Sequence, residues 1–137
     1  MGKTGVFVMS TLQCLEENSL EHSVLVIAPT RELAKQINSE YERIGKDLSF
    51  KSMVFTGGDN FKKDIKALSK IKPQIIIGTP GKLKDLILHK DGIKGENVKH
   101  FVIDECDLAL KDIGMYFPQK LALPSHLTPR NFQLYLS

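Results

Sequence analysis

The sequence predicts an α/β fold in which a mostly parallel sheet carries helices on both faces. Two observations support this prediction. Short apolar runs at 24–28, 74–77 and 101–103 alternate with segments whose apolar residues recur at helical spacing. Clusters of Gly, Pro, Thr and charged residues follow directly where these runs end. Ligands of such sheets bind at the carboxyl ends of the strands, so we expect a binding site along one edge.

The bulk composition fits one folded domain, and we expect residues 1–137 to form it. With 42% hydrophobic and 26% charged residues, the chain is not of the disordered class. Its net charge of +3 permits a polyanionic partner without requiring one. Cys14 and Cys106 lack metal-ligand spacing and are expected to be reduced thiols inside the cell. No membrane segment or signal peptide is expected.

The first predicted element is a helix over residues 3–17, with an apolar stripe that includes Phe7 and Leu12. Gly2-Lys3-Thr4 stands at its start. These residues match the end of the phosphate-loop pattern, in which backbone N–H groups cradle phosphates, the Lys meets the terminal phosphates and the Thr hydroxyl binds Mg²⁺. Three residues alone are a weak signal, but they stand where the chemistry needs them.

The next unit is a strand over 24–28, which Pro29-Thr30 ends, and a helix over 31–47. Thr30 is the expected N-cap of this helix. Its buried face is predicted from apolar residues at helical spacing, namely Leu33, Ile37, Tyr41, Ile44 and Leu48.

The rest of the chain continues the alternation of strands and helices. We expect strands over 50–55, 74–77, 101–103 and 132–136, and helices over 60–70, 82–89 and shortly after Asp107. Residues 91–97 and most of 114–131 are expected to be loops, because they are rich in Gly or Pro.

Three acids, Asp104, Glu105 and Asp107, follow the apolar run 101–103. Carboxylates packed this closely repel one another unless a cation or a fixed donor lies beside them. A solvated turn after a core strand is the simpler alternative. Together with Thr4 on a phosphate loop, however, Asp104 is placed to hold Mg²⁺ and Glu105 to orient a water against the terminal phosphate.

Two further clusters, Gly57-Gly58 and Thr79-Pro80-Gly81, also follow predicted strands. They could be turn chemistry alone. Glycine-rich strand ends nevertheless leave backbone N–H groups open for phosphate oxygens, and Arg31 and Lys82 add positive charge. A second row of phosphate contacts beside a nucleotide site would suit a nucleic-acid motor.

These motifs, taken in order, resemble the N-terminal RecA-like domain of a DEAD-box RNA helicase. The matching residues are GKT at 2–4, PTRELA at 29–34, GG at 57–58, TPGK at 79–82 and DECD at 104–107. The DECD spelling is similar to the eukaryotic subfamily that acts in pre-mRNA splicing and mRNA export. The resemblance implies a RecA-like phosphate-loop NTPase fold, a nuclear location, and splicing or export proteins as partners.

The resemblance also implies roles for single residues, with ATP and Mg²⁺ as cofactors. Gly2, Lys3 and Thr4 would bind the phosphates, Thr4 and Asp104 would hold Mg²⁺, and Glu105 would act on the attacking water. Asp107 would couple the nucleotide state to RNA. The residues that would hold the RNA backbone without reading bases are Thr30, Arg31, Gly57, Gly58, Thr79, Gly81 and Lys82. Lys82 departs from the Arg that is usual in this family; it keeps the charge but loses the planar fork.

Several parts of the family's pattern have no counterpart in the sequence. These are the adenine-reading motif, the strand and first half of the phosphate loop, and the second RecA-like domain, while Ser137 falls where the S-A-T motif would begin. We therefore expect an incomplete fold, truncated at both ends, that is inactive alone although its parent is an ATP-dependent RNA helicase. The alternative is a catalytically inactive truncated paralogue that acts only as a nucleic-acid-binding or interaction module. An unrelated phosphate-loop kinase or GTPase would give no reason for PTRELA.

Overall fold

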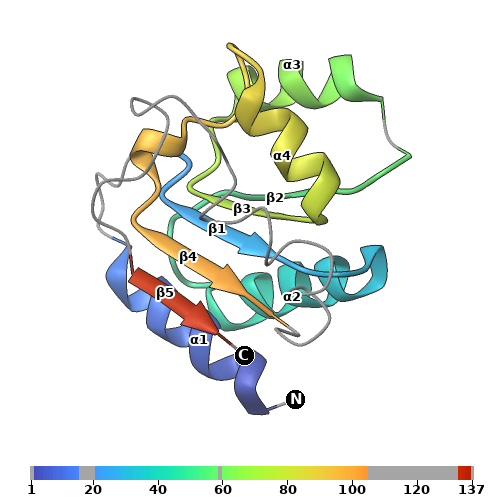
Figure 1. Ribbon diagram of the computed structural model, residues 1–137. Helices are drawn as coiled ribbons and strands as arrows, with labels where there is room; N and C mark the ends of the chain where they lie inside the picture. The colour runs from blue at the N-terminus through green and yellow to red at the C-terminus, as the bar shows by residue number, and fades with distance from the viewer. Residues whose placement is uncertain (1, 16–20, 59, 105–132, 137) are drawn as a thin grey trace.

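In the part of the chain that the structure describes, five parallel strands form one sheet in the order β2-β3-β1-β4-β5. The computed structural model describes residues 2–15, 21–58, 60–104 and 133–136 (Figure 1). The strands are β1 (Val24–Ile27), β2 (Ser52–Phe55), β3 (Ile75–Gly78), β4 (His100–Ile103) and β5 (Gln133–Leu136). The helices are α1 (Gly2–Cys14), α2 (Arg31–Ile44), α3 (Phe61–Ile71), α4 (Pro80–Leu88) and a short 3₁₀ turn at Gly95–Asn97.

Helices cover both faces of the sheet, as the sequence predicts (Figure 1). Successive strand residues point to opposite faces, so each central strand supplies two cores. Leu25 and Ile76 belong to the core under α3 and α4. Val26 and Ile77 belong to the core under α1 and α2. All four are at most 2% exposed, which explains why these strands are apolar throughout rather than alternating with polar residues.

The predicted apolar stripe of α2 is correct except at its end. Ile37 and Tyr41 are fully buried, but the helix stops at Ile44, and Leu48 is 53% exposed. The N–H of Gly45 donates to the carbonyl of Tyr41 and closes the last turn. Because the chain turns away at Gly45, Leu48 no longer follows the helical face.

The junction between β3 and α4 is shorter than predicted. Gly78 belongs to β3, and α4 begins at Pro80 rather than at Lys82, so Thr79 alone connects them. A side chain at position 78 would clash, since a Cβ there would lie 2.4 Å from the carbonyl oxygen of Phe55. Pro80 suits the first helical position because it needs no N–H partner there.

Only part of the chain that follows Asp104 lies within the described residues. The expected final strand is present as β5, which pairs in parallel with β4 at one edge of the sheet. The helix predicted after Asp107 and the loop over 114–131 lie outside the described residues. None of the helices in the described part of the chain is long and apolar enough to cross a membrane.

Candidate functional site

The carboxyl ends of four strands lie side by side at one edge of the sheet. Backbone hydrogen bonds join them in series, from Ala28 N–H to Gly78 O (2.9 Å), Thr79 N–H to Phe55 O (3.1 Å) and Asp104 N–H to Ile27 O (3.0 Å). The residues that follow these strands are the polar clusters seen in the sequence. The fold therefore brings these clusters to one edge, which we call the strand-end edge.

Asp104 follows β4 directly and is 5% exposed. Its backbone N–H is held by the end of β1, which fixes its position beside that strand. Carboxylate oxygens are ligands that Mg²⁺ prefers, so Asp104 fits the metal role predicted for it. Glu105 and Asp107 lie outside the described residues.

Gly2, Lys3 and Thr4 form the first turn of α1. This helix begins at the end of the molecule toward which the arrowheads of β4 and β5 point (Figure 1). The predicted phosphate-loop residues therefore begin a helix, and they lie on the side of the sheet where the strands end. A helix N-terminus carries a partial positive charge and open N–H groups, which favour phosphates.

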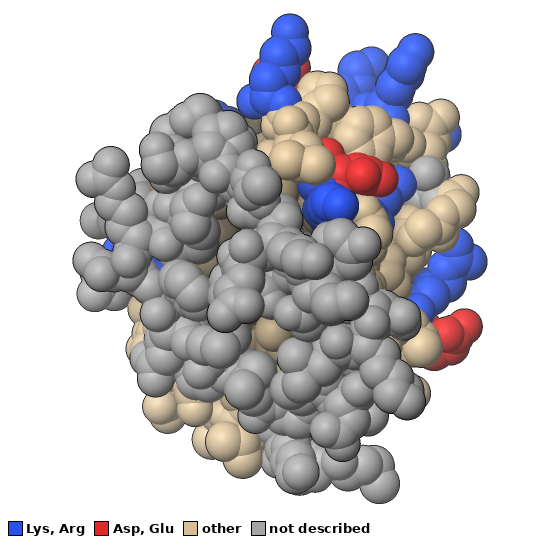
Figure 2. Space-filling view, in the orientation of Figure 1, with Lys and Arg blue, Asp and Glu red and all other residues tan. Residues whose placement is uncertain are grey.

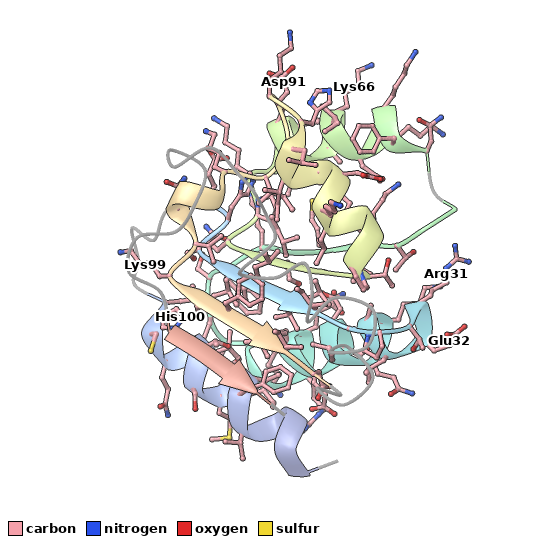
Figure 3. All side chains as sticks on the ribbon, in the orientation of Figure 1. Arg31, Glu32, Lys66, Asp91, Lys99 and His100 are labelled. Carbon is pink, nitrogen blue, oxygen red and sulfur yellow. The ribbon has the colours of Figure 1, made fainter. Side chains whose placement is uncertain are left out.

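Arg31 connects the start of α2 with the turn after β2. Its Nη2 donates to the carbonyl oxygen of Gly57 at 2.5 Å, and in Figure 3 its side chain points toward the end of the segment that follows β2. Gly58 has a φ of +91°, a conformation that favours glycine, and a Cβ there would lie 2.9 Å from Arg31 Nη2. The guanidinium has five N–H donors, so this bond leaves others for a phosphate.

Thr30 and Thr79 both precede helices, but their hydroxyl groups differ. Thr30 Oγ1 accepts from the N–H of Leu33 at 3.1 Å and caps α2. Thr79 makes no side-chain cap to α4. Gly81, in the first turn of α4, is exposed, and a Cβ there would meet nothing within 4 Å. The start of α4 therefore offers a hydroxyl and backbone N–H groups with space beside them.

Lys82, which was predicted to contact RNA, is largely buried. It is 9% exposed, and its Nζ lies 2.5 Å from Asp64 Oδ2 and 5.6 Å from the centre of the Phe61 ring. The ammonium group thus joins α4 to α3. Asp64 was not among the residues predicted for the site, although it is the one acid among the lysines of residues 60–72.

Comparisons with known proteins agree with this geometry. The profile of the DEAD/DEAH box helicase family matches residues 1–136. The chain is 47% identical over 116 residues to the human ATP-dependent RNA helicase DDX39A. It is 50% identical over 118 residues to the ATP-dependent RNA helicase uap56 of Schizosaccharomyces pombe. Each alignment covers 84% of this chain and 27% of the relative, so the chain spans about a quarter of their length.

Solved structures show the same fold. A DEAD box protein from the hyperthermophile Methanococcus jannaschii has a TM-score of 0.81 at 30% identity, over 98% of this chain and 35% of that one. S. cerevisiae Dbp5 bound to RNA and ADP BeF3 has a TM-score of 0.77 at 28% identity, over 98% of this chain and 32% of that one. The predicted RecA-like fold is therefore confirmed. Because the family profile covers nearly every residue, the chain belongs to the DEAD/DEAH box helicase family.

Proposed function

We propose that this chain binds ATP and single-stranded RNA at its strand-end edge, as part of an ATP-dependent RNA helicase. The observation that carries the proposal is the Arg31–Gly57 contact beside the open start of α4. Both features lie at the strand-end edge and offer groups that can bind phosphate. The named function of the relatives DDX39A and uap56 supports it, as does the Dbp5 complex with RNA and ADP BeF3.

The nucleotide half of the site combines α1 with the end of β4. In the proposal, the first-turn N–H groups of α1, with Lys3 and Thr4, bind the phosphates of ATP. Asp104 and Thr4 hold Mg²⁺, which neutralises phosphate charge when bound. Glu105 positions the attacking water, and Asp107 couples the nucleotide state to RNA.

The RNA half of the site uses backbone contacts and carries no base recognition. The groups that face the RNA strand are Arg31, the Gly57-Gly58 turn, Thr79 and Gly81. Thr30 fixes the start of α2. We assign Lys82 a supporting role, because its ion pair with Asp64 holds the first turn of α4 in place. Phosphate contacts position a strand without reading its sequence.

For the full-length protein we propose a role in pre-mRNA splicing and mRNA export in the nucleus, with protein partners from those processes. The DECD spelling at 104–107 supports this assignment, together with 47% and 50% identity to DDX39A and uap56.

The test is RNA binding by the 137-residue chain, measured by fluorescence anisotropy with unstructured RNAs of different sequence. We expect affinity to fall steeply with salt and to vary little with sequence, because the contacts are to phosphates. Arg31→Gln should weaken the binding of every RNA. Arg43 is an exposed arginine in the last turn of α2, and Arg43→Gln should leave RNA binding unchanged. Strong base preference, or no effect of Arg31→Gln, would contradict the proposal.

ATP hydrolysis in the presence of RNA separates the helicase function from its alternative. In the full-length parent, Glu105→Gln should leave ATP binding nearly unchanged and lower turnover at least tenfold, because a positioned base is worth about 10²–10⁴ in rate. RNA binding by the full-length protein without any ATP turnover would instead favour the interaction module.

A further inference from the structure

The outer face of α3 carries four exposed lysines, Lys62, Lys63, Lys66 and Lys70, which we call the α3 lysine face. None of them forms an ion pair within the described part of the chain. The one acid of the helix, Asp64, is 13% exposed and pairs inward with Lys82. The positive charge of the α3 lysine face is therefore not neutralised by its own helix.

This face begins beside the strand-end edge and leads away from it. Asn60 caps α3 just after the Gly57-Gly58 turn, and the helix then runs back across the molecule (Figure 1). The rise from Lys62 to Lys70 is about 12 Å. Figure 2 shows blue side chains along the top of the molecule, in the region of α3, and Figure 3 places Lys66 there.

A shallow depression of about 450 Å³ lies on this face. Lys62, Lys63 and Lys66 line it together with Asn60. Asp91 is the one acid in its lining, so three lysines stand against a single carboxylate. The charge of the depression favours an anion.

We propose that the α3 lysine face binds the backbone of RNA that flanks the segment held at the strand-end edge, which lengthens the RNA footprint. This inference rests on the proposed RNA binding. Lys62, Lys66 and Lys70 recur one turn apart, so they present a row of point charges to successive phosphates. Sequence-independent binding to a phosphate backbone needs only such charges.

An acidic protein segment suits this face less well. Protein interfaces bury aromatic and apolar side chains at their centre. Phe61 and Ile65 of α3 are only partly buried, and both pack against the core beneath the helix. Ile65 is the one apolar side chain in the lining of the depression, beside three lysines, so the face offers more charge than apolar surface.

The test compares a short RNA of about 6 nucleotides, which fits the strand-end edge, with one of about 20 nucleotides, which also reaches α3. The variant replaces Lys62, Lys66 and Lys70 by Gln. We expect its affinity for the long RNA to fall on the order of tenfold near 0.1 M salt, and the slope of log affinity against log salt to flatten by about 2, since each phosphate contact contributes about 0.7. Affinity for the short RNA should stay the same.

Two further variants control for charge and for position. Replacing the same three lysines by Arg should retain the long-RNA affinity, because the charge remains. Replacing Lys46, Lys51 and Lys99 by Gln makes the same change of charge at exposed positions near the amino ends of the strands, and should have little effect. Thermal unfolding of each variant shows whether the fold is kept.

The outcomes distinguish failure of the inference about α3 from failure of the proposed function. If the wild type binds both RNAs and the Gln variant binds the long RNA equally well, the inference about α3 is wrong and the proposed function stands. If the wild type binds neither RNA, the proposed function fails and the inference fails with it. If the Gln variant keeps its RNA affinity but loses binding to polyglutamate, the face is a protein-binding surface and the inference is overturned.

Discussion

At the scale of single residues, the glycines of the candidate site differ in the space around them. A Cβ at Gly57 or Gly81 would meet nothing within 4 Å, while Gly58 has a φ of +91° and a Cβ there would lie 2.9 Å from Arg31 Nη2. The sequence shows that three glycines follow strands, but it does not show how much space surrounds each of them. Open space beside Gly57 and Gly81 suits a ligand that approaches the backbone, whereas Gly58 is required by the turn itself.

Gly81→Ala should separate folding from RNA binding. Because the added methyl group meets no protein atom and Ala favours a helix by up to about 1 kcal/mol, the melting temperature should stay the same or rise slightly. RNA affinity should fall, because the methyl group occupies space beside the backbone. Gly5→Ala in α1 is the matched control, since it also has open space; it should leave RNA affinity unchanged when nucleotide is absent. Equal RNA affinity of Gly81→Ala and wild type would remove Gly81 from the site.

Gly58→Ala should lower the free energy of unfolding by about 1–2 kcal/mol, because a side chain at positive φ is strained. The new Cβ would also press on Arg31 Nη2 at 2.9 Å. Chemical denaturation measures the change, and Gly57→Ala serves as the control that should cost little. Similar denaturation midpoints for the two variants would show that the turn is not as tight as described.

At the scale of secondary structure elements, the ion pair between Lys82 and Asp64 joins α4 to α3. Both side chains are largely buried, at 7% and 13% exposure. Removing one partner of such a pair leaves the other charge buried without compensation, which costs more than removing both.

A double-mutant cycle tests this connection. Lys82→Met and Asp64→Leu should each lower the free energy of unfolding by about 3 kcal/mol, and the double variant should recover much of that loss. Chemical denaturation of the four proteins gives the coupling energy. Simple addition of the two losses would show that the side chains do not interact. Since the pair holds the start of α4, Lys82→Met should also weaken RNA binding in conditions where the variant is folded.

At the scale of the whole molecule, two groups with shifted pKa values lie near the amino ends of the strands, opposite the candidate site. Burial lowers the pKa of His100 from 6.5, and the positive charge of Lys99 adds to the effect. For Glu21, burial acts to raise the pKa, but the hydrogen bond from Lys94 and nearby positive charges outweigh it and lower the pKa from 4.5. Both groups therefore bind protons more readily in the unfolded chain.

Stability should consequently fall on acidification. Because the unfolded chain takes up more protons, the free energy of unfolding should fall as the pH drops below 6.5 through His100, and again below 4.5 through Glu21. Urea denaturation over a pH series measures both steps. His100→Gln should flatten the first step and Glu21→Gln the second, and each variant serves as the control for the other. An unchanged pH profile in both variants would contradict the assignment.

The sequence alone determined the layers of the fold and the edge on which the candidate site lies. Apolar periodicity and the placing of Gly and Pro are local properties, so the strands and helices of the described residues could be predicted to within a few residues. The end of α2 was misplaced because Leu48 continues the helical spacing, although the chain already turns at Gly45. The predicted roles of all the site residues remain predictions.

The tertiary structure decided which side chains meet. Arg31 bonds to Gly57, 26 positions away, and Lys82 is taken up by Asp64 on another helix. Sequence spacing does not reveal such pairs, because they depend on how the helices cross the sheet. In the same fold the Thr30 hydroxyl caps α2, whereas the Thr79 hydroxyl makes no capping bond to α4, although both residues stand between a strand and a helix. A pattern of residue types therefore indicated the candidate site, and packing decided which of its polar groups form bonds within the chain.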